Sequence, residues 1–233
     1  MAAEDALSES KGKAIVDAFL GKMDIGIAQI CPQNKWALTA DRAASLLKEN
    51  PEIEFQLHAN VRLFEIQRRP IDLSTDDSAY WHQLKEINDL LNGRQYSAHA
   101  GKRCEASLIK TFENTKRLED YLGIPVAIEG HYPTKDSTFL MDSWEEYAQL
   151  LKNDVHYAID LSHIHILFRK TRHCDRELLK DILANDRCIE IHLSANNGFE
   201  DEHIEITREP WWWDVFQERN KNATIFYEGA QKK

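Results

Sequence analysis

The chain has little of what secreted and membrane proteins depend on. Its 233 residues include only 4 cysteines (Cys31, Cys104, Cys174 and Cys188), which are scattered and form no Cys-x-x-Cys pair. Residues 1–22 lack the apolar core of a signal peptide, so a reducing, cytoplasmic location is expected. No apolar run approaches the length of a membrane span, so no membrane partner is expected.

Positive charge is also scarce. The chain has 29 lysines and arginines against 39 aspartates and glutamates, a formal net charge of −10 at pH 7. Such an acidic domain lacks the broad basic surface of most nucleic-acid-binding proteins. Bound metal ions would add local positive charge that this count omits, so a DNA substrate is disfavoured rather than excluded.

Internal linkers, repeats and low-complexity segments are missing too, which predicts one domain over residues 23–233. Strand-like apolar runs alternate with helical patterns along it. The expected strands are 24–30, 53–57, 95–99, 126–129, 157–160, 188–192 and 223–228. This alternation indicates parallel strands joined by helices, and the length fits a TIM-type (β/α) barrel.

Two features of this barrel are expected to be irregular. Only seven strands are recognisable, and an eighth would have to lie between Ile30 and Ile53, where only one helix fits. The barrel is therefore expected to be shortened or irregular there. Residues 1–22 form a weakly amphipathic pattern, which predicts a helical extension before the first strand.

Helix boundaries can also be read from the sequence. One helix is expected to open at Thr75 and stop at Gly93, and another to run from about Glu105 to Gly123. Ser143 and Asp175 have the side chains and spacing of residues that cap the first turn of a helix.

Five strand-like runs end on a side chain that can bind a metal. These side chains are His99, Glu129, Asp160, His192 and Glu228, spaced 30, 31, 32 and 36 residues apart, about one strand-plus-helix unit. An earlier run ends on His58, 41 residues before His99. Parallel barrel strands point one way, so their ends converge on one mouth. Three histidines and three carboxylates at one rim predict a metal site.

Three further donors follow strand ends. His163 lies three residues after Asp160, and Asp201-Glu-His203 follows the loop after His192. In an extended segment, Asp201 and His203 point to the same side. The complete expected ligand set is His58, His99, Glu129, Asp160, His163, His192, Asp201, His203 and Glu228. Among these, Glu129, Glu228 and His163 are also the expected catalytic residues.

The order of these motifs resembles the endonuclease IV branch of the xylose-isomerase-like TIM-barrel superfamily. The matching segments, which together cover about residues 24–229, are His58, His99-Ala-Gly, Glu129-Gly, Asp160-x-x-His163, His192-Leu, Asp201-x-His203 and Glu228. The resemblance implies a trinuclear zinc site that draws its ligands from strand ends, and metal-assisted cleavage of a phosphoester. The chain is shorter than that branch and leaves little room for DNA-penetrating loops, which puts recognition of an extruded abasic nucleotide in doubt.

Two other branches share part of the pattern. The multinuclear non-haem iron oxidative enzymes have many of the same ligands and a tryptophan after the Asp-x-His pair, where this chain has Trp211. They usually carry asparagine where this chain has His163. That resemblance implies iron and a cysteine-containing peptide partner. Sugar isomerases and epimerases need mainly Glu129, Asp160, His192 and Glu228, which leaves the other donors surplus.

These alternatives share one expectation for ligands. The cofactor is two or three divalent ions, either Zn, Mn or Fe, and the substrate is a small polar or phosphorylated molecule. Lys102 and Arg103, just after His99-Ala-Gly, are expected to bind a phosphate or carboxylate. Asn196 lies in the loop before Asp201 and is a further candidate for substrate binding. Trp211 opens a run of three tryptophans and either stacks on the substrate or closes the barrel.

Less specific interpretations apply to single residues. One histidine at a strand end is more often a hydrogen-bonded core residue than a ligand, and only the set argues for metal. Glu190 is expected to face away from His192 and form an outer salt bridge. His131 is expected to be structural or exposed, and His165 a neighbour of the donors at most. Glu209 rivals Glu228 as a ligand, but it lies in a loop.

Overall fold

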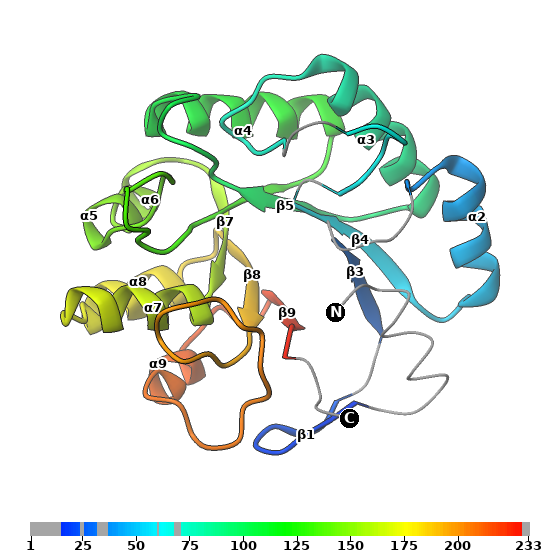
Figure 1. Ribbon diagram of the computed structural model, residues 1–233. Helices are drawn as coiled ribbons and strands as arrows, with labels where there is room; N and C mark the ends of the chain where they lie inside the picture. The colour runs from blue at the N-terminus through cyan, green and yellow to red at the C-terminus, as the bar shows by residue number, and fades with distance from the viewer. Residues whose placement is uncertain (1–14, 24–25, 32–36, 60, 68–70, 230–233) are drawn as a thin grey trace.

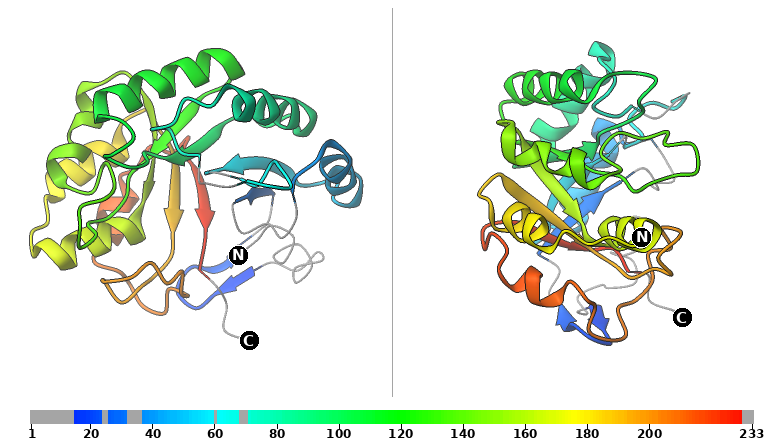
Figure 2. Two further views of the ribbon diagram at one scale, coloured as in Figure 1. Left: turned by 45° about the horizontal axis from the view of Figure 1, so that its top comes forward. Right: turned by 90° about the vertical axis from the view of Figure 1, so that its left-hand side faces the viewer.

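Seven parallel strands form one continuous sheet in the order of the chain. They are β3 (Ile27–Ile30), β4 (Glu54–His58), β5 (Tyr96–His99), β6 (Val126–Glu129), β7 (His156–Asp160), β8 (Cys188–Leu193) and β9 (Thr224–Tyr227). The computed structural model describes residues 15–23, 26–31, 37–59, 61–67 and 71–229. The strands surround a common centre with the helices outside them (Figure 1), and each strand pairs in parallel with the next, as β8 and β9 (gold and red) show in the left view of Figure 2. The expected TIM-type barrel is confirmed.

The helices lie between the strands in sequence and cover their outer faces. They are α2 (Ala40–Glu49), α3 (Ser78–Leu91), α4 (Leu108–Leu122), α5 (Trp144–Tyr147), α6 (Gln149–Lys152), α7 (Leu161–Thr171), α8 (Arg176–Ala184) and α9 (Trp213–Gln217). Both expected caps are confirmed, because Ser143 accepts from the Glu146 amide at 3.4 Å and Asp175 from the Leu178 amide at 3.1 Å. No helix in the described residues is long and apolar enough to cross a membrane.

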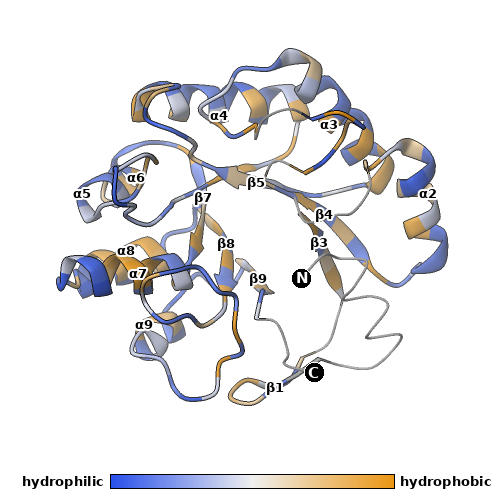
Figure 3. Ribbon diagram, viewed as in Figure 1, coloured by the Kyte–Doolittle hydropathy of each residue, from blue (hydrophilic) through white to orange (hydrophobic). Residues whose placement is uncertain are grey.

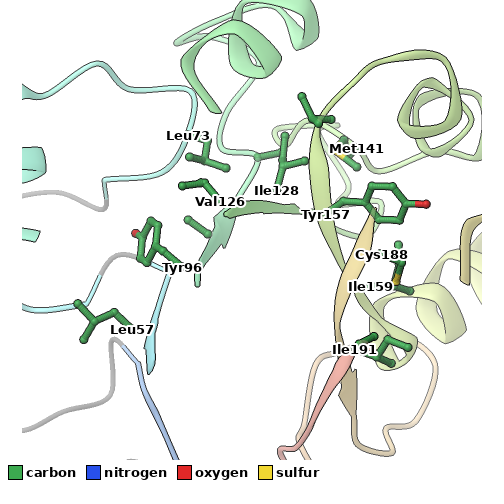
Figure 4. Packing of buried hydrophobic residues seen from close by; sticks show 14 of the residues in the cluster. Leu57, Leu73, Tyr96, Val126, Ile128, Met141, Tyr157, Ile159, Cys188 and Ile191 are labelled. Atoms are coloured by element: carbon green, nitrogen blue, oxygen red, sulfur yellow. The ribbon is translucent and has the colours of Figure 1, made fainter. Parts of the chain in front are cut away.

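The apolar core lies between the sheet and the helices. Phe55, Leu57, Ile128, Ile159 and Ile191 point outward from their strands and are buried in one hydrophobic cluster. Figure 4 shows part of this cluster around β6, β7 and β8, and Figure 3 shows the polar outer side of helices such as α2.

Alternate strand positions face the barrel interior and carry polar side chains. Gln56, Ser97, Glu129, Glu190 and His192 are each buried there. The fold therefore places apolar residues outside the barrel wall and hydrogen-bonding and ionisable residues within it.

The barrel has seven strands in the part of the chain that the structure describes, as the sequence predicted. β3 pairs directly with β4, Ile30 beside Leu57, and the described part of the segment that joins them contains one helix, α2, and no further strand. The long segment between β8 and β9 also adds no strand, because β8 pairs directly with β9. Its turn-forming residues, including Asn197 and Gly198, fold it into a loop closed by the Ala195–Ile204 backbone pair. β3 and β9 are the end strands of the sheet.

The expected N-terminal helix is wrong over the residues that the structure describes. Residues 1–14 of that prediction lie outside the described residues. The remainder forms an antiparallel hairpin of β1 (Ile15–Asp17) and β2 (Gly21–Met23). The Asp17 carboxylate accepts from the amides of Phe19 at 2.8 Å and Leu20 at 2.7 Å, and Gly21 has a φ of 76°. This turn chemistry outweighs a weak amphipathic pattern.

Asp17 also fastens the hairpin to the barrel. Its buried carboxylate accepts from the Ile206 amide at 3.2 Å and from the Tyr227 hydroxyl. Asp17→Ala leaves buried donors without acceptors, so we expect it to lower the free energy of unfolding by about 1–3 kcal/mol. Denaturant unfolding measures this loss. Asp89→Ala is the matched control, since Asp89 is exposed and its carboxylate pairs with Lys85 across one helical turn. Equal effects of the two substitutions would contradict this role for Asp17.

Candidate metal centre

The structure gathers seven of the nine expected donors into three overlapping groups. The ligand atoms within each group lie within 4.8 Å of one another. The His99 group is His58, His99 and Glu129; the Asp160 group is Glu129, Asp160 and His163; the Glu228 group is His58, His192 and Glu228. His58 and Glu129 each belong to two groups, so the donors form one connected cluster rather than separate sites.

Asp201 and His203 join this cluster from the loop after β8. Asp201 Oδ2 lies 3.3 Å from His163 Nε2 and 3.1 Å from His203 Nε2. His203 Nδ1 lies 3.5 Å from Glu228 Oε2. His203 has a φ of 46°, a left-handed conformation that costs a residue with a side chain about 1–3 kcal/mol. The structure thus brings all nine expected donors together.

Strand register explains why the donors converge. His99 lies beside Glu129 on neighbouring strands, and Asp160 lies beside His192. Parallel neighbours are about 4.8 Å apart, so side chains at one level of the interior face are within reach of a shared ion. His163 is one turn into α7, where the Asp160 carboxylate accepts from the Ser162 amide at 2.6 Å and so starts the helix at the strand end.

Burial shifts the pKa values of several donors when no cation is bound. Burial raises the pKa of Glu129 to about 8, against the opposing effect of His192 and His163. Burial lowers the pKa of His99 to about 3. Burial also lowers the pKa of His163, but the Asp160 and Asp201 carboxylates more than offset this and raise it to about 10. In the metal-free protein, protons on Glu129 and His163 therefore offset the buried negative charge that bound metal ions would otherwise offset.

Two orphaned atoms test whether the residues fit a metal. Glu129 Oε2 and His192 Nδ1 are both buried, and neither has a hydrogen-bond partner among the described residues. They lie 3.7 Å apart. Buried polar atoms are normally satisfied, so a carboxylate oxygen and an imidazole nitrogen facing each other in this way fit a shared cation. Imidazole and carboxylate donors suit Zn, Mn or Fe.

The metal-free protein is expected to lose stability as the pH rises from 6.5 to 10. A group whose pKa is higher in the folded than in the unfolded chain stabilises the fold below its unfolded pKa, and this contribution is lost as the pH rises through the folded pKa. The pKa of Glu129 rises from 4.5 to about 8 and that of His163 from 6.5 to about 10, so both contributions decline in this window.

Thermal unfolding in chelator across this window measures the effect. Bound metal takes the place of the protons, so excess divalent metal is expected to reverse the trend. A metal-free protein that becomes more stable toward alkaline pH would contradict the assignment of these two shifts.

Sequence reasoning misplaced Glu190. Residues two apart on a strand share a face, so Glu190 points inward with His192 rather than away from it. Its carboxylate is buried and lies 2.7 Å from His192 Nε2. Burial raises the pKa of Glu190, but hydrogen bonds from His192 and Ser97 outweigh burial and lower it. The expected outer salt bridge is wrong, and strand alternation alone could have revealed the inward face.

His131 is a second residue that the sequence analysis did not place near the donors. Its ring centroid lies 4.5 Å from that of His99 and 4.1 Å from that of Phe139. It reaches the donors because the segment after β6 folds back, with the His131 amide donating to the Met141 carbonyl at 3.0 Å. Burial lowers its pKa well below the ordinary value. No local pattern predicts this fold-back.

The four expected substrate-binding residues are spread more widely. Arg103 donates to Asp142 at 2.5 Å and to Glu146 at 2.5 and 2.7 Å, so its charge is already matched by carboxylates. Lys102 is half-buried and pairs with Phe139 through its backbone, and its role stays a prediction.

Asn196 and Trp211 make contacts with neighbouring segments of the protein. Asn196 donates to the Ser162 carbonyl at 3.0 Å and accepts from the Gly198 amide at 2.8 Å, which holds the loop that carries Asp201 and His203. The indole of Trp211 donates to His165 Nδ1 at 2.8 Å and packs on Phe168, so these contacts place it against α7.

The last two residues that the sequence offered as rivals, His165 and Glu209, lie outside the three donor groups. His165 is engaged by Trp211 and belongs to none of the three donor groups. Glu209 is exposed, whereas Glu228 belongs to a donor group, and the role of Glu228 as a ligand stays a prediction.

Comparisons with known proteins identify the fold. No protein-family model matches the chain, and no curated protein matches it in sequence. A D-tagatose 3-epimerase-like protein superposes with a TM-score of 0.65 at 15% identity, covering 92% of this chain and 88% of that one. A family 2 AP endonuclease from Brucella melitensis superposes with a TM-score of 0.61 at 14% identity, covering 88% and 82%.

A third structure is similar over nearly its whole length. The 3-keto-D-glucoside 4-epimerase from E. coli superposes with a TM-score of 0.50 at 10% identity, covering 90% of this chain and 94% of that one. Likeness at such low identity shows the fold and not the reaction. The chain has the fold of the xylose-isomerase-like TIM-barrel proteins, as the order of its motifs predicted.

Proposed function

We propose that this chain is a divalent-metal-dependent enzyme that hydrolyses a phosphoester at the mouth of the barrel. The observation that carries the proposal is the overlap of the His99 and Asp160 groups at Glu129, whose carboxylate has two oxygens and can serve two ions. A site for one ion does not need this sharing. Two or three ions held a few ångströms apart suit in-line displacement at phosphorus.

Two carboxylates are placed to bridge ions. Glu129 Oε1 lies 3.8 Å from His99 Nε2, while its Oε2 lies 3.4 Å from His58 Nε2. Glu228 Oε1 faces His192 Nδ1 at 3.7 Å. Because the two oxygens of Glu129 face different histidines, one side chain can serve two ions.

His163 is oriented as a ligand rather than as a proton donor to the substrate. Its Nδ1 lies 2.9 Å from the Gly130 carbonyl, which can only accept, so Nδ1 carries the proton. Its Nε2 then faces Asp160 at 3.4 Å and Asp201 at 3.3 Å. When bound, the metal ions would lower the pKa of a water molecule and polarise the phosphoryl oxygen. The residues of the chain hold these ions, and burial excludes competing water from the donors.

Isomerisation or epimerisation of a small sugar is the second candidate. His192 Nδ1 lies 3.7 Å from both Glu129 Oε2 and Glu228 Oε1, and Asp160 lies beside His192 in the strand register, so this candidate's four donors come from neighbouring positions of the interior. Two of the similar structures are described as an epimerase or epimerase-like protein. An isomerase-type site does not need His99, Asp201 and His203 as metal ligands, which is why hydrolysis is preferred.

Metal content and substrate turnover together test the proposal. Protein purified without oxygen is expected to carry two or three zinc or manganese ions per chain and to hydrolyse a phosphodiester, with abasic duplex DNA and a small aryl phosphodiester as substrates. A chelator is expected to abolish hydrolysis, and added metal to restore it. One ion per chain with ketose epimerisation would favour the second candidate. Iron with oxygen uptake on a cysteine-containing peptide would favour an oxidase instead.

A further inference from the structure

Glu190 lies inside the barrel, one layer below His192. It is 1% exposed, and four hydrogen-bond donors surround its carboxylate. Oε1 accepts from Gln29 at 2.8 Å, Ser97 at 2.5 Å and His192 at 2.7 Å, and Oε2 accepts from Gln95 at 2.7 Å. A buried carboxylate is costly unless it is fully hydrogen-bonded, and this arrangement supplies that for the ionised form.

The ionised carboxylate determines which nitrogen of His192 carries the proton. A carboxylate can only accept, so Nε2 of His192 must donate to it. The lone pair of the neutral ring then lies on Nδ1. That nitrogen is buried without a hydrogen-bond partner among the described residues and points between Glu129 and Glu228. The contact with Glu190 therefore directs the metal-binding nitrogen at the donor cluster.

Ser97 extends the same constraint to His58. The Ser97 hydroxyl has one proton, which it donates to Glu190, so its oxygen accepts from His58 Nδ1 at 2.7 Å. The other nitrogen of His58, Nε2, is left with the lone pair and lies 3.4 Å from Glu129 Oε2. One carboxylate thus acts on two imidazoles on opposite sides of the barrel interior.

We propose that Glu190 is a positioning residue that sets the tautomer and the ring orientation of two metal-binding histidines together, His192 directly and His58 through Ser97. The proposal rests on the proposed function in one respect, since it takes these histidines to be metal ligands. Gln29 and Gln95 occupy the remaining acceptor positions of Glu190, so this carboxylate orients ligands and is not a ligand itself. Partners that orient ligating histidines in this way typically change metal affinity by about 10–100-fold when they are removed.

Glu190→Gln and Ser97→Ala separate the direct effect on His192 from the effect on His58 through Ser97. Glutamine brings an N–H group into a position surrounded by four donors, so it cannot satisfy them all. Glu190→Gln is expected to perturb both histidines, whereas Ser97→Ala is expected to perturb His58 and leave His192 unchanged. Glu209→Gln is the matched control, because Glu209 is exposed and outside the cluster.

Two measurements follow these variants. Side-chain nitrogen chemical shifts in the Zn²⁺-bound protein report which nitrogen of each histidine carries the proton. Titration with Zn²⁺ alone reports the affinity and the number of ions per chain. We expect Nε2 protonation of His192 and Nδ1 protonation of His58 in the wild type. We expect Zn²⁺ affinity to be about 10–100-fold weaker in Glu190→Gln, with no change in the control.

Wild-type tautomers and wild-type Zn²⁺ affinity in Glu190→Gln would overturn the proposal. If that variant does not fold, Ser97→Ala decides, and an unchanged His58 tautomer and affinity would overturn it. A wild-type protein that binds Zn²⁺ in a Glu190-dependent manner but hydrolyses no phosphoester would reject the proposed function and support this inference. A wild-type protein that binds no divalent metal would reject both.

Discussion

Glu129→Gln is expected to lower the metal-dependent activity by about a thousandfold, which corresponds to about 4 kcal/mol of lost transition-state stabilisation. Glu129 belongs to two of the three donor groups, and its two oxygens face different histidines, His99 and His58. Glutamine keeps the shape of the side chain but removes the charge and one acceptor oxygen. The ions of the His99 and Asp160 groups should therefore be lost together, leaving at most one ion per chain, which elemental analysis measures.

The same substitution is expected to leave the fold intact. Burial raises the pKa of Glu129 to about 8, so the metal-free protein already favours a neutral side chain at this position. Metal-free Glu129→Gln should then be at least as stable as the wild type at alkaline pH, which thermal unfolding in chelator checks. Glu209→Gln, at an exposed position, controls for the substitution itself. Full metal content and activity in Glu129→Gln would show that Glu129 does not bridge ions.

His203→Ala is expected to remove one ion and lower hydrolysis by about a hundredfold, or nearly 3 kcal/mol. His203 lies 3.1 Å from Asp201 and 3.5 Å from Glu228, at the edge of the cluster that the loop after β8 provides. The His99 group does not include it, so the ions bound there should stay. The measurement is metal content per chain together with the rate of phosphodiester hydrolysis.

His165→Ala is the matched control for this experiment. His165 is also a half-buried histidine, but it accepts from Trp211 and belongs to none of the donor groups. We expect it to keep all ions and most of the activity. If His203→Ala behaves like His165→Ala in both measurements, a site with fewer ions, of the isomerase type, becomes the better assignment.

Several tertiary features were beyond sequence reasoning because they join residues far apart in the chain. Arg103 lies at the rim, as its position after His99 predicts, but Asp142 and Glu146 arrive from a loop and a helix about 40 residues later and match its charge. His131 reaches His99 only because the loop after β6 folds back. The path of a loop depends on what it packs against, which no local pattern records.

The sequence by itself determined the strands, their direction and the identity of the donors at their ends. Period-two burial and chain spacing are local properties, and in a parallel sheet any donor at a strand end is carried to the same mouth. His99, Glu129, Asp160 and His192 could therefore be chosen without coordinates. Only the tertiary structure decided which donors share a group, that β8 pairs directly with β9, and that Glu190 holds two of the histidines. Those outcomes depend on register and side-chain packing between segments tens of residues apart.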